Sequence, residues 1–254
     1  MPLLFGHAHG GVAEGSLMPI LSDAGFMGRF TQPLTTGSVN LSLYVTQGPV
    51  LVTEEGTVDE GHAHSVVPAA SVASRTVNST AQAQQAAPLE IPDVGFGVAF
   101  ADNNANKMIG GRLGYVRAPA VEVYVSGFHA MYDPDSYLGY QGYAVSLQTQ
   151  RWGFQFLGEG ALLRQEFQTE TTFETLKRPG FYLEATRPIG SFEPVVRWSR
   201  LLDGKVGGVT AIPSIDELAL GLNYRFTPTV PLKVAYLYHP DFDDRIVVQW
   251  AFGF

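Results

Sequence analysis

Two pairs of histidines have the spacing that most directly suggests metal chemistry. His7 and His9 form one H-x-H pair, and His62 and His64 form the other. Because residues i and i+2 share one face of an extended strand, each pair could chelate Zn²⁺ or Cu²⁺ with a nearby carboxylate as a further ligand. Both pairs stand in stretches that we expect to be loops, so solvated loop histidines are the competing interpretation.

Charged and amide side chains that alternate with apolar ones suggest a second chemistry, the handling of ions. In the stretch DRIVVQWAFGF (244–254), Arg245 and Gln249 alternate with Ile246 and Val248. The same alternation elsewhere gives a polar set that comprises Arg29, Arg112, Glu122, Gln148, Arg151, Gln155, Glu159, Glu184, Glu193, Arg197, Asn223, Arg225, Lys233, Arg245 and Gln249. These residues could line a pore and set the field that permeating ions experience. They could equally pair with one another and fill a polar interior.

The composition argues against several other functions. The chain has no cysteine, which excludes disulfides and thiolate chemistry. Its net charge of −8 argues against a nucleic-acid partner. No nucleophile elbow, H-E-x-x-H, P-loop or dinucleotide fingerprint is present, so we expect no enzymatic activity and no cofactor.

The elements that carry this polar set are predicted strands, because the hydrophobic period is two. Only 16% of the residues are charged, well below the quarter that is usual in soluble domains. The predicted strands are long enough for a tilted membrane strand. There are eleven, at 23–32, 38–47, 108–117, 120–132, 139–149, 151–165, 179–188, 191–202, 214–226, 230–239 and 244–254.

Alternation alone would also suit a soluble sandwich, but two features favour a membrane. Aromatic residues gather at strand ends, as in the girdles of outer-membrane barrels. The connections also alternate between short ones (33–38, 117–120, 149–151, 187–191 and 227–231) and mostly longer ones (48–107, 133–138, 166–178, 203–214 and 240–244). We therefore predict an all-β fold, a transmembrane antiparallel β-barrel with short periplasmic turns, in which residues 1–254 form a single domain.

The longest connection, 48–107, is predicted to be an extracellular loop. Residues 52–90 have little strand character and are expected to be disordered. Residues 91–107 are expected to fold into the barrel, and 93–101 to belong to the loop rather than span. Aspartates cluster in two other outer loops and could bind Ca²⁺ or bridge lipopolysaccharide through divalent ions, with turn formation as the alternative: Asp133 and Asp135 in one, Asp241, Asp243 and Asp244 in the other.

The chain resembles the bacterial phosphate-selective porin O/P-like family. The resemblance rests on DNNANKMIGGRLGYVRAPAVEVYVSGF (102–128), FEPVVRWSRL (192–201), ELALGLNYRFTPTVPLKVAYLY (217–238) and DDRIVVQWAFGF (243–254). It implies a sixteen-stranded, often trimeric barrel, of which this chain is the C-terminal part with upstream strands missing. The run Trp250, Phe252 and Phe254 matches the C-terminal signal that the barrel assembly machinery recognises in such proteins.

One departure from the family concerns selectivity. The phosphate-selective members carry a ladder of lumenal arginines and lysines, whereas the polar set here is mixed in sign. We therefore expect a weakly selective porin of the bacterial outer membrane that passes small hydrophilic solutes or ions. Its expected surroundings are the lipid bilayer and lipopolysaccharide. The alternatives are a non-conducting surface barrel and a soluble β-sandwich that binds a ligand or an adhesion partner.

Overall fold

The computed structural model describes residues 25–51, 91–92, 94–95, 107–117, 120–169, 172–227, 230–240 and 243–250, and all their regular elements are strands. Among these residues no helix is long and apolar enough to cross a membrane. The main strands are β1 (Gly25–Leu34), β2 (Gly37–Thr46), β5 (Met108–Arg117), β6 (Val121–Met131), β7 (Gly139–Arg151), β8 (Phe154–Gln168), β9 (Phe173–Thr186), β10 (Phe192–Leu201), β13 (Ile215–Thr227), β14 (Val230–Tyr238) and β15 (Arg245–Trp250). The short strands are β3 (Val50–Leu51), β4 (Val94–Gly95), β11 (Gly204–Val206) and β12 (Val209–Ile212).

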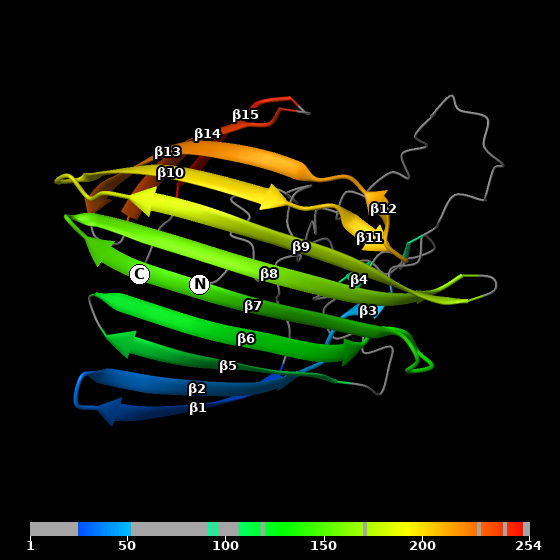
Figure 1. The fold of residues 1–254 in the computed structure, drawn as a ribbon. Coiled ribbons are helices and arrows are strands. Elements are labelled where there is room, and N and C mark those ends of the chain that lie inside the picture. The colour runs from blue at the N-terminus through cyan, green and yellow to red at the C-terminus, as the bar shows by residue number, and fades with distance from the viewer. Residues whose placement is uncertain are drawn as a thin grey trace, which may run out of the picture.

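The main strands follow one another across a single curved sheet, in the order β1-β2-β5-β6-β7-β8-β9-β10-β13-β14-β15 (Figure 1). Every neighbouring pair is antiparallel. With β11 and β12 the sheet has 13 strands. The prediction of an all-β antiparallel fold is confirmed. Within the described part of the chain the sheet is open, because β1 pairs with β2 alone and β15 with β14 alone.

The connections between main strands differ at the two ends of the sheet. At one end, which we call the short-turn end, the turns are tight; the β7–β8 turn consists of Trp152 and Gly153. Both residues have positive φ, 53° and 77° respectively, as a two-residue type I′ hairpin requires. At the other end, the long-connection end, lie the linkage of β2 to β5, the loop 132–138 and the β11–β12 hairpin (Figure 1).

Two predicted outer loops are largely strand. The prediction of a loop at 166–178 is wrong, because β8 continues to Gln168 and β9 begins at Phe173. Within the predicted loop 203–214, β11 pairs with β9, with Val206 opposite Leu176. Strands β8 and β9 therefore extend further at the long-connection end than the sequence predicts. Strand β4 pairs with β3 and not with the main sheet, so the described part of 93–101 stays outside the main sheet.

Strand register defines two faces of the main sheet. Leu41, Leu113, Val125 and Val145 lie opposite one another on successive strands and define the apolar face. The neighbouring row, which includes Ser42, Arg112 and Ser126, defines the polar face. The period of two therefore sorts the side chains as the sequence predicts.

The polar face carries a hydrophobic cluster near the long-connection end. Met108, Phe128, Tyr132 and Tyr140 are buried there, and Val94 packs against them. A second cluster contains Phe167, Leu176 and Val206, with Ile91 packed against it. The Gln165 side-chain amide also donates a hydrogen bond to the carbonyl oxygen of Pro92 at 2.7 Å. The described residues of the 91–107 segment thus lie against the polar face.

Burial of Tyr132 gives the long-connection end a testable response to alkali. The Tyr132 hydroxyl, in the loop after β6, donates to the Glu166 carbonyl, and desolvation by burial raises its pKa to about 12. The folded protein holds this proton more tightly than the unfolded chain, whose tyrosine pKa is about 10. Its contribution to stability is therefore complete below pH 10 and is lost as the pH rises through about 12.

We expect the free energy of unfolding of the native protein to fall between pH 10 and pH 12 by about 2 kcal/mol more than that of Tyr132→Phe. Denaturant unfolding of both proteins across this range measures the difference. Parallel curves would show that Tyr132 is accessible to solvent.

Candidate functional site

The apolar face is exposed on all eleven main strands. Its exposed large side chains include Val145 (51%), Leu220 (47%) and Val248 (63%), from β7, β13 and β15. The charged residues of this face stand at the strand ends; they are Arg117, Arg151, Arg164, Glu166, Lys177, Arg200 and Asp216. Between them, the described strands place no Asp, Glu, Lys or Arg on this face. Contiguous apolar surface of this extent is rare on soluble monomers.

Aromatic rings form a band along the short-turn end of this face. Phe192, Tyr224, Phe226 and Trp250 contact one another in sequence across β10, β13 and β15, with centroids 4.9, 4.6 and 5.9 Å apart. Further along the same end, the Arg187 guanidinium lies 4.9 Å from the centroid of the Phe154 ring. Aromatic residues with nearby cations are typical of a membrane–water boundary.

The exposed apolar side chains of the apolar face form a belt, which we call the apolar belt, and its height matches that of the belt of outer-membrane barrels. On β13 it runs from Leu218 to Phe226, eight residue steps, or roughly 27 Å along the strand. A strand tilt of about 40° reduces this to roughly 21 Å, close to the ~25 Å apolar belt of outer-membrane barrels.

On the polar face, Arg112 is held by a tyrosine rather than by a carboxylate. Its guanidinium carbon lies 3.5 Å from the centroid of the Tyr124 ring, and the Tyr124 hydroxyl donates to Glu122 at 3.2 Å. The ring occupies the space above Gly114, directly opposite in register. A cation stacked on a tyrosine that is itself bonded to a carboxylate is fixed in place without being neutralised by direct contact.

Gly114 is therefore a position where a methyl group should be costly. A Cβ there would lie 2.1 Å from Cδ1 of Tyr124, so Gly114→Ala must displace the ring and the arginine stacked on it. We expect the free energy of unfolding to fall by about 1–3 kcal/mol. Gly160→Ala is the control, because a Cβ at Gly160 meets nothing within 4 Å. Denaturant titration of both variants in lipid vesicles measures the difference; equal costs would contradict the ring placement.

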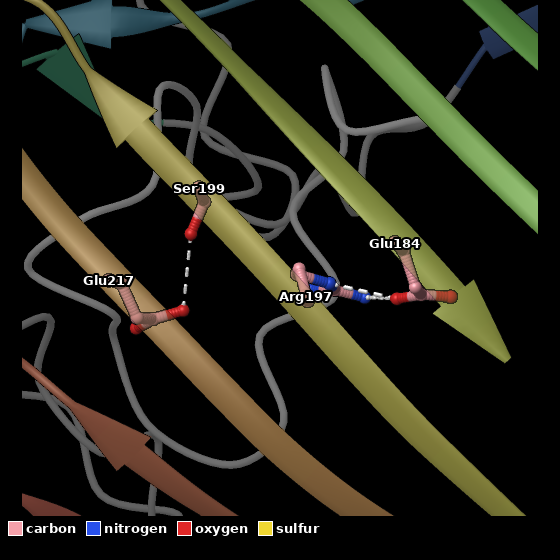
Figure 2. Close-up of polar contacts among 4 residues, drawn as sticks. All are labelled: Glu184, Arg197, Ser199 and Glu217. Carbon is pink, nitrogen blue, oxygen red and sulfur yellow. Dashed lines mark hydrogen bonds and ion pairs between the residues drawn. The ribbon is translucent and has the colours of Figure 1, made fainter.

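One ion pair of the polar face joins β9 and β10. Figure 2 shows Arg197 pointing toward Glu184, and both Nε and Nη2 of the arginine donate to Oε2 of Glu184, at 2.8 and 2.6 Å. The guanidinium carbon also lies 5.1 Å from the centroid of the Tyr182 ring. On the other side of β10, Ser199 donates to Glu217 at 3.3 Å (Figure 2). The carboxylate of Glu217 in turn lies 3.0 Å from His239 Nε2.

Toward the short-turn end, the polar face carries a further pair, in which Arg225 Nη2 donates to Glu193 at 2.6 Å. Beside it, Asn223, Lys233 and Gln249 lie in register on β13, β14 and β15. Opposite charges thus pair along this wall. This pairing is the arrangement expected of a mixed-charge surface, and it weakens any net field.

Most of the predicted polar set shares one face. Register places Arg29, Arg112, Glu122, Gln148, Gln155, Glu159, Glu184, Glu193, Arg197, Asn223, Arg225, Lys233, Arg245 and Gln249 together on the polar face. Arg151 differs from the prediction. It lies opposite Phe154 on the apolar face, because Trp152 and Gly153 form the turn and shift the alternation.

Sequence reasoning missed several polar-face residues: Tyr124, Arg178, Tyr182, Glu217 and His239. Tyr124 and Tyr182 are absent from the predicted polar set because that set comprises only charged and amide side chains. A signal was present, however, since each is flanked by apolar neighbours at i−1 and i+1, which alternation assigns to the other face.

Several predicted sites lie outside the described residues. These are the histidine pairs His7/His9 and His62/His64, and two residues of the C-terminal signal, Phe252 and Phe254. Trp250 is described and stacks on Phe226. Within the described part of the chain, no group of three or more metal-ligating side chains is found. The Asp133 carboxylate accepts hydrogen bonds from the backbone N–H groups of Tyr137 and Leu138, so it organises its own loop.

Together these features describe a curved antiparallel sheet with one exposed apolar face, whose charged residues stand at the strand ends, and one face of paired charges, tyrosines and amides. Comparison of the chain with protein-family models and with curated proteins finds no match.

Proposed function

We propose that this protein is an outer-membrane β-barrel porin that lets small hydrophilic solutes or ions diffuse through a water-filled lumen. One observation carries the proposal: the apolar face is exposed on every main strand and free of charge across its centre. A bilayer is the environment in which such a face is stable, since a strand that crosses it must present apolar side chains to lipid. The polar face would then line the lumen.

The polar face supports a weakly selective pore. Because Arg197 pairs with Glu184 and Arg225 with Glu193, neither sign of charge dominates the wall. Ile91, Pro92 and Val94, which contact the polar face near the long-connection end, would narrow the passage there. The resemblance to phosphate-selective porins supports the same class of function, and adds the trimer and the barrel assembly machinery as proposed partners.

The two alternatives make different demands on the same faces. A soluble sandwich would cover the apolar face with a second sheet, and the exposure of Val145 and Val248 argues against such a layer. A non-conducting surface barrel would bury the same belt in lipid but close its lumen. Conductance separates that protein from a porin.

The decisive experiment is single-channel recording. Protein produced from its complete reading frame is refolded into a planar bilayer, and the reversal potential is measured under a salt gradient. We expect discrete conductance steps and a small reversal potential, because the wall charges are paired. Stable insertion without conductance would contradict the porin and favour the closed barrel. A protein that stays in solution without detergent would contradict both membrane proposals.

A further inference from the structure

A cleft of about 830 Å³ opens on the apolar-face side of the sheet at the long-connection end. It lies beside β9, at the point where the chain passes from β10 to β11. Strand β9 pairs with both of these strands (Figure 1). Its lining includes four cationic side chains and flanking apolar ones: Arg164, Lys177, Arg200 and Lys205, with Leu162 and Leu202.

Three of these cations stand side by side on adjacent strands. Arg164 on β8 lies opposite Lys177 on β9, which lies opposite Lys205 on β11. Like charges in directly opposed positions destabilise a sheet. Among the described residues, no side-chain hydrogen bond or ion pair compensates any of the three. Such a row is stable when an anion lies against it.

The cleft lining has two acidic residues, Glu174 and Asp203, and neither pairs with this row. Glu174 lies opposite Phe167, on the other face of β9 from Lys177, and accepts a hydrogen bond from the Thr172 hydroxyl at 3.4 Å. Asp203 accepts hydrogen bonds from the Ser214 backbone N–H at 3.0 Å and from Thr210 at 3.4 Å, so its carboxylate holds the β11–β12 hairpin. Arg200 has its own partner, with Nε 3.6 Å from Asp216. The excess positive charge of the cleft is therefore carried by the row Arg164, Lys177 and Lys205.

The cationic row lies at the edge of the apolar belt. Leu162 lies opposite Pro179, and this pair is two residues along the strands from the pair Arg164 and Lys177, a spacing of roughly 7 Å. Phe181 and Trp198, whose ring centroids are 5.1 Å apart, continue the belt below them. A ligand on the row would thus have apolar surface directly beneath it.

We propose that this cleft binds the phosphorylated headgroup of an acylated membrane lipid, with the phosphates against Lys177 and Lys205 and the acyl chains along Leu162 and Pro179. The inference rests on the proposed function, because it needs the apolar face in lipid. Lipid A, the bis-phosphorylated and multiply acylated anchor of lipopolysaccharide, has this chemistry. Arg164, with its planar guanidinium, suits bidentate contact with a phosphate.

The test uses the protein refolded in neutral detergent and titrated with hexa-acylated, bis-phosphorylated lipid A, with bound lipid counted by native mass spectrometry. In Lys177→Gln/Lys205→Gln both lost charges are on exposed side chains, so the fold is expected to persist. Each cation near a membrane surface contributes about 1 kcal/mol to lipid binding, so the double variant should bind lipid A roughly thirtyfold more weakly.

The matched control removes two cations from the opposite rim of the same face. Arg151→Gln/Arg187→Gln loses the same charge at the short-turn end, and we expect its lipid A affinity to equal that of the native protein. An equal loss in both double variants would overturn the proposal, because it would indicate attraction by overall charge alone.

Two measurements on the native protein need no variant. Lipid A stripped of both phosphates should bind far more weakly than the intact lipid; equal binding would overturn the proposal. Millimolar inorganic phosphate should leave lipid A bound, whereas full displacement would indicate a site for free phosphate instead.

Bilayer insertion of the same preparation separates the two proposals: insertion without lipid A binding overturns this inference only, and failure to insert overturns the proposed function with it.

Discussion

Replacing Val234 by arginine should lower the free energy of unfolding from lipid vesicles by about 2–4 kcal/mol. Val234 lies on the apolar face of β14, in register with Leu222 and Val248. Val234 is two residues further from the short-turn end than Leu232, which lies in register with Tyr224 and Trp250. It therefore lies inside the apolar belt. An arginine there must lose its hydration or thin the bilayer, and either costs free energy. Denaturant titration of the refolded protein in vesicles, followed by tryptophan fluorescence, measures the cost.

The neighbouring residue provides the control. Ala235 lies on the polar face, opposite Gly221 and Val247, so Ala235→Arg adds the same side chain with no charge directly across from it. We expect this variant to lose less than about 1 kcal/mol, because surface substitutions that disturb no packing are usually tolerated. Equal costs for the two arginines would contradict the assignment of the faces, and a larger cost at Ala235 would reverse it.

Reversing the charge of Arg197 should shift the ion selectivity of the pore toward cations by severalfold. Arg197→Glu changes the wall by two charge units and removes the hydrogen bonds to Glu184. At about 4 Å in water, each unit charge is worth about 1 kcal/mol to a passing ion before salt screens it. The new carboxylate would also face Glu184 and repel it. The reversal potential under a salt gradient measures the shift.

Arg187→Glu is the control for this shift. It changes the net charge by the same amount, but Arg187 stacks on Phe154 at the short-turn rim and not on the polar face. Its reversal potential should match that of the native protein. If the two variants shift the reversal potential equally, charges at the short-turn rim would determine the selectivity as strongly as Arg197 does, which would contradict the prediction.

The fold could be predicted from the sequence because its strands alternate over long runs. Each expected strand overlaps a main strand of the sheet, and the side chains of β13, β14 and β15 fall on the expected faces. Alternation specifies register strongly, since a slip of one residue exchanges the two faces.

The misassigned regions have local physical causes. Phe167 and Leu176 extend β8 and β9 because they are buried beneath Ile91 and Val206, contacts that come from distant parts of the chain. No local pattern in 166–178 signals them. Arg151 lies on the apolar face and not on the predicted polar face because Trp152 adopts a positive φ, which is uncommon for a residue with a side chain.

The partners of the polar-face charges could not be predicted either. Alternation places Arg197 and Glu184 on one face, but only the register between β9 and β10 brings their side chains together. The row of Arg164, Lys177 and Lys205 depends in the same way on the pairing of β11 with β9. Such sites follow from the relative displacement of strands, which the sequence of each strand alone does not determine.

The order of the main strands also determines how the two free edges are directed. The path from β1 to β15 contains eleven strands, each antiparallel to the next, so its first and last members point the same way. A direct seam between them would be the sheet's one parallel pair, with slanted and evenly spaced hydrogen bonds. A closed wall that is antiparallel throughout needs an odd number of strands beyond these eleven, whatever their source. The direction of β1 relative to β15 therefore limits how this sheet can close in a membrane, where an open edge would leave backbone groups without partners.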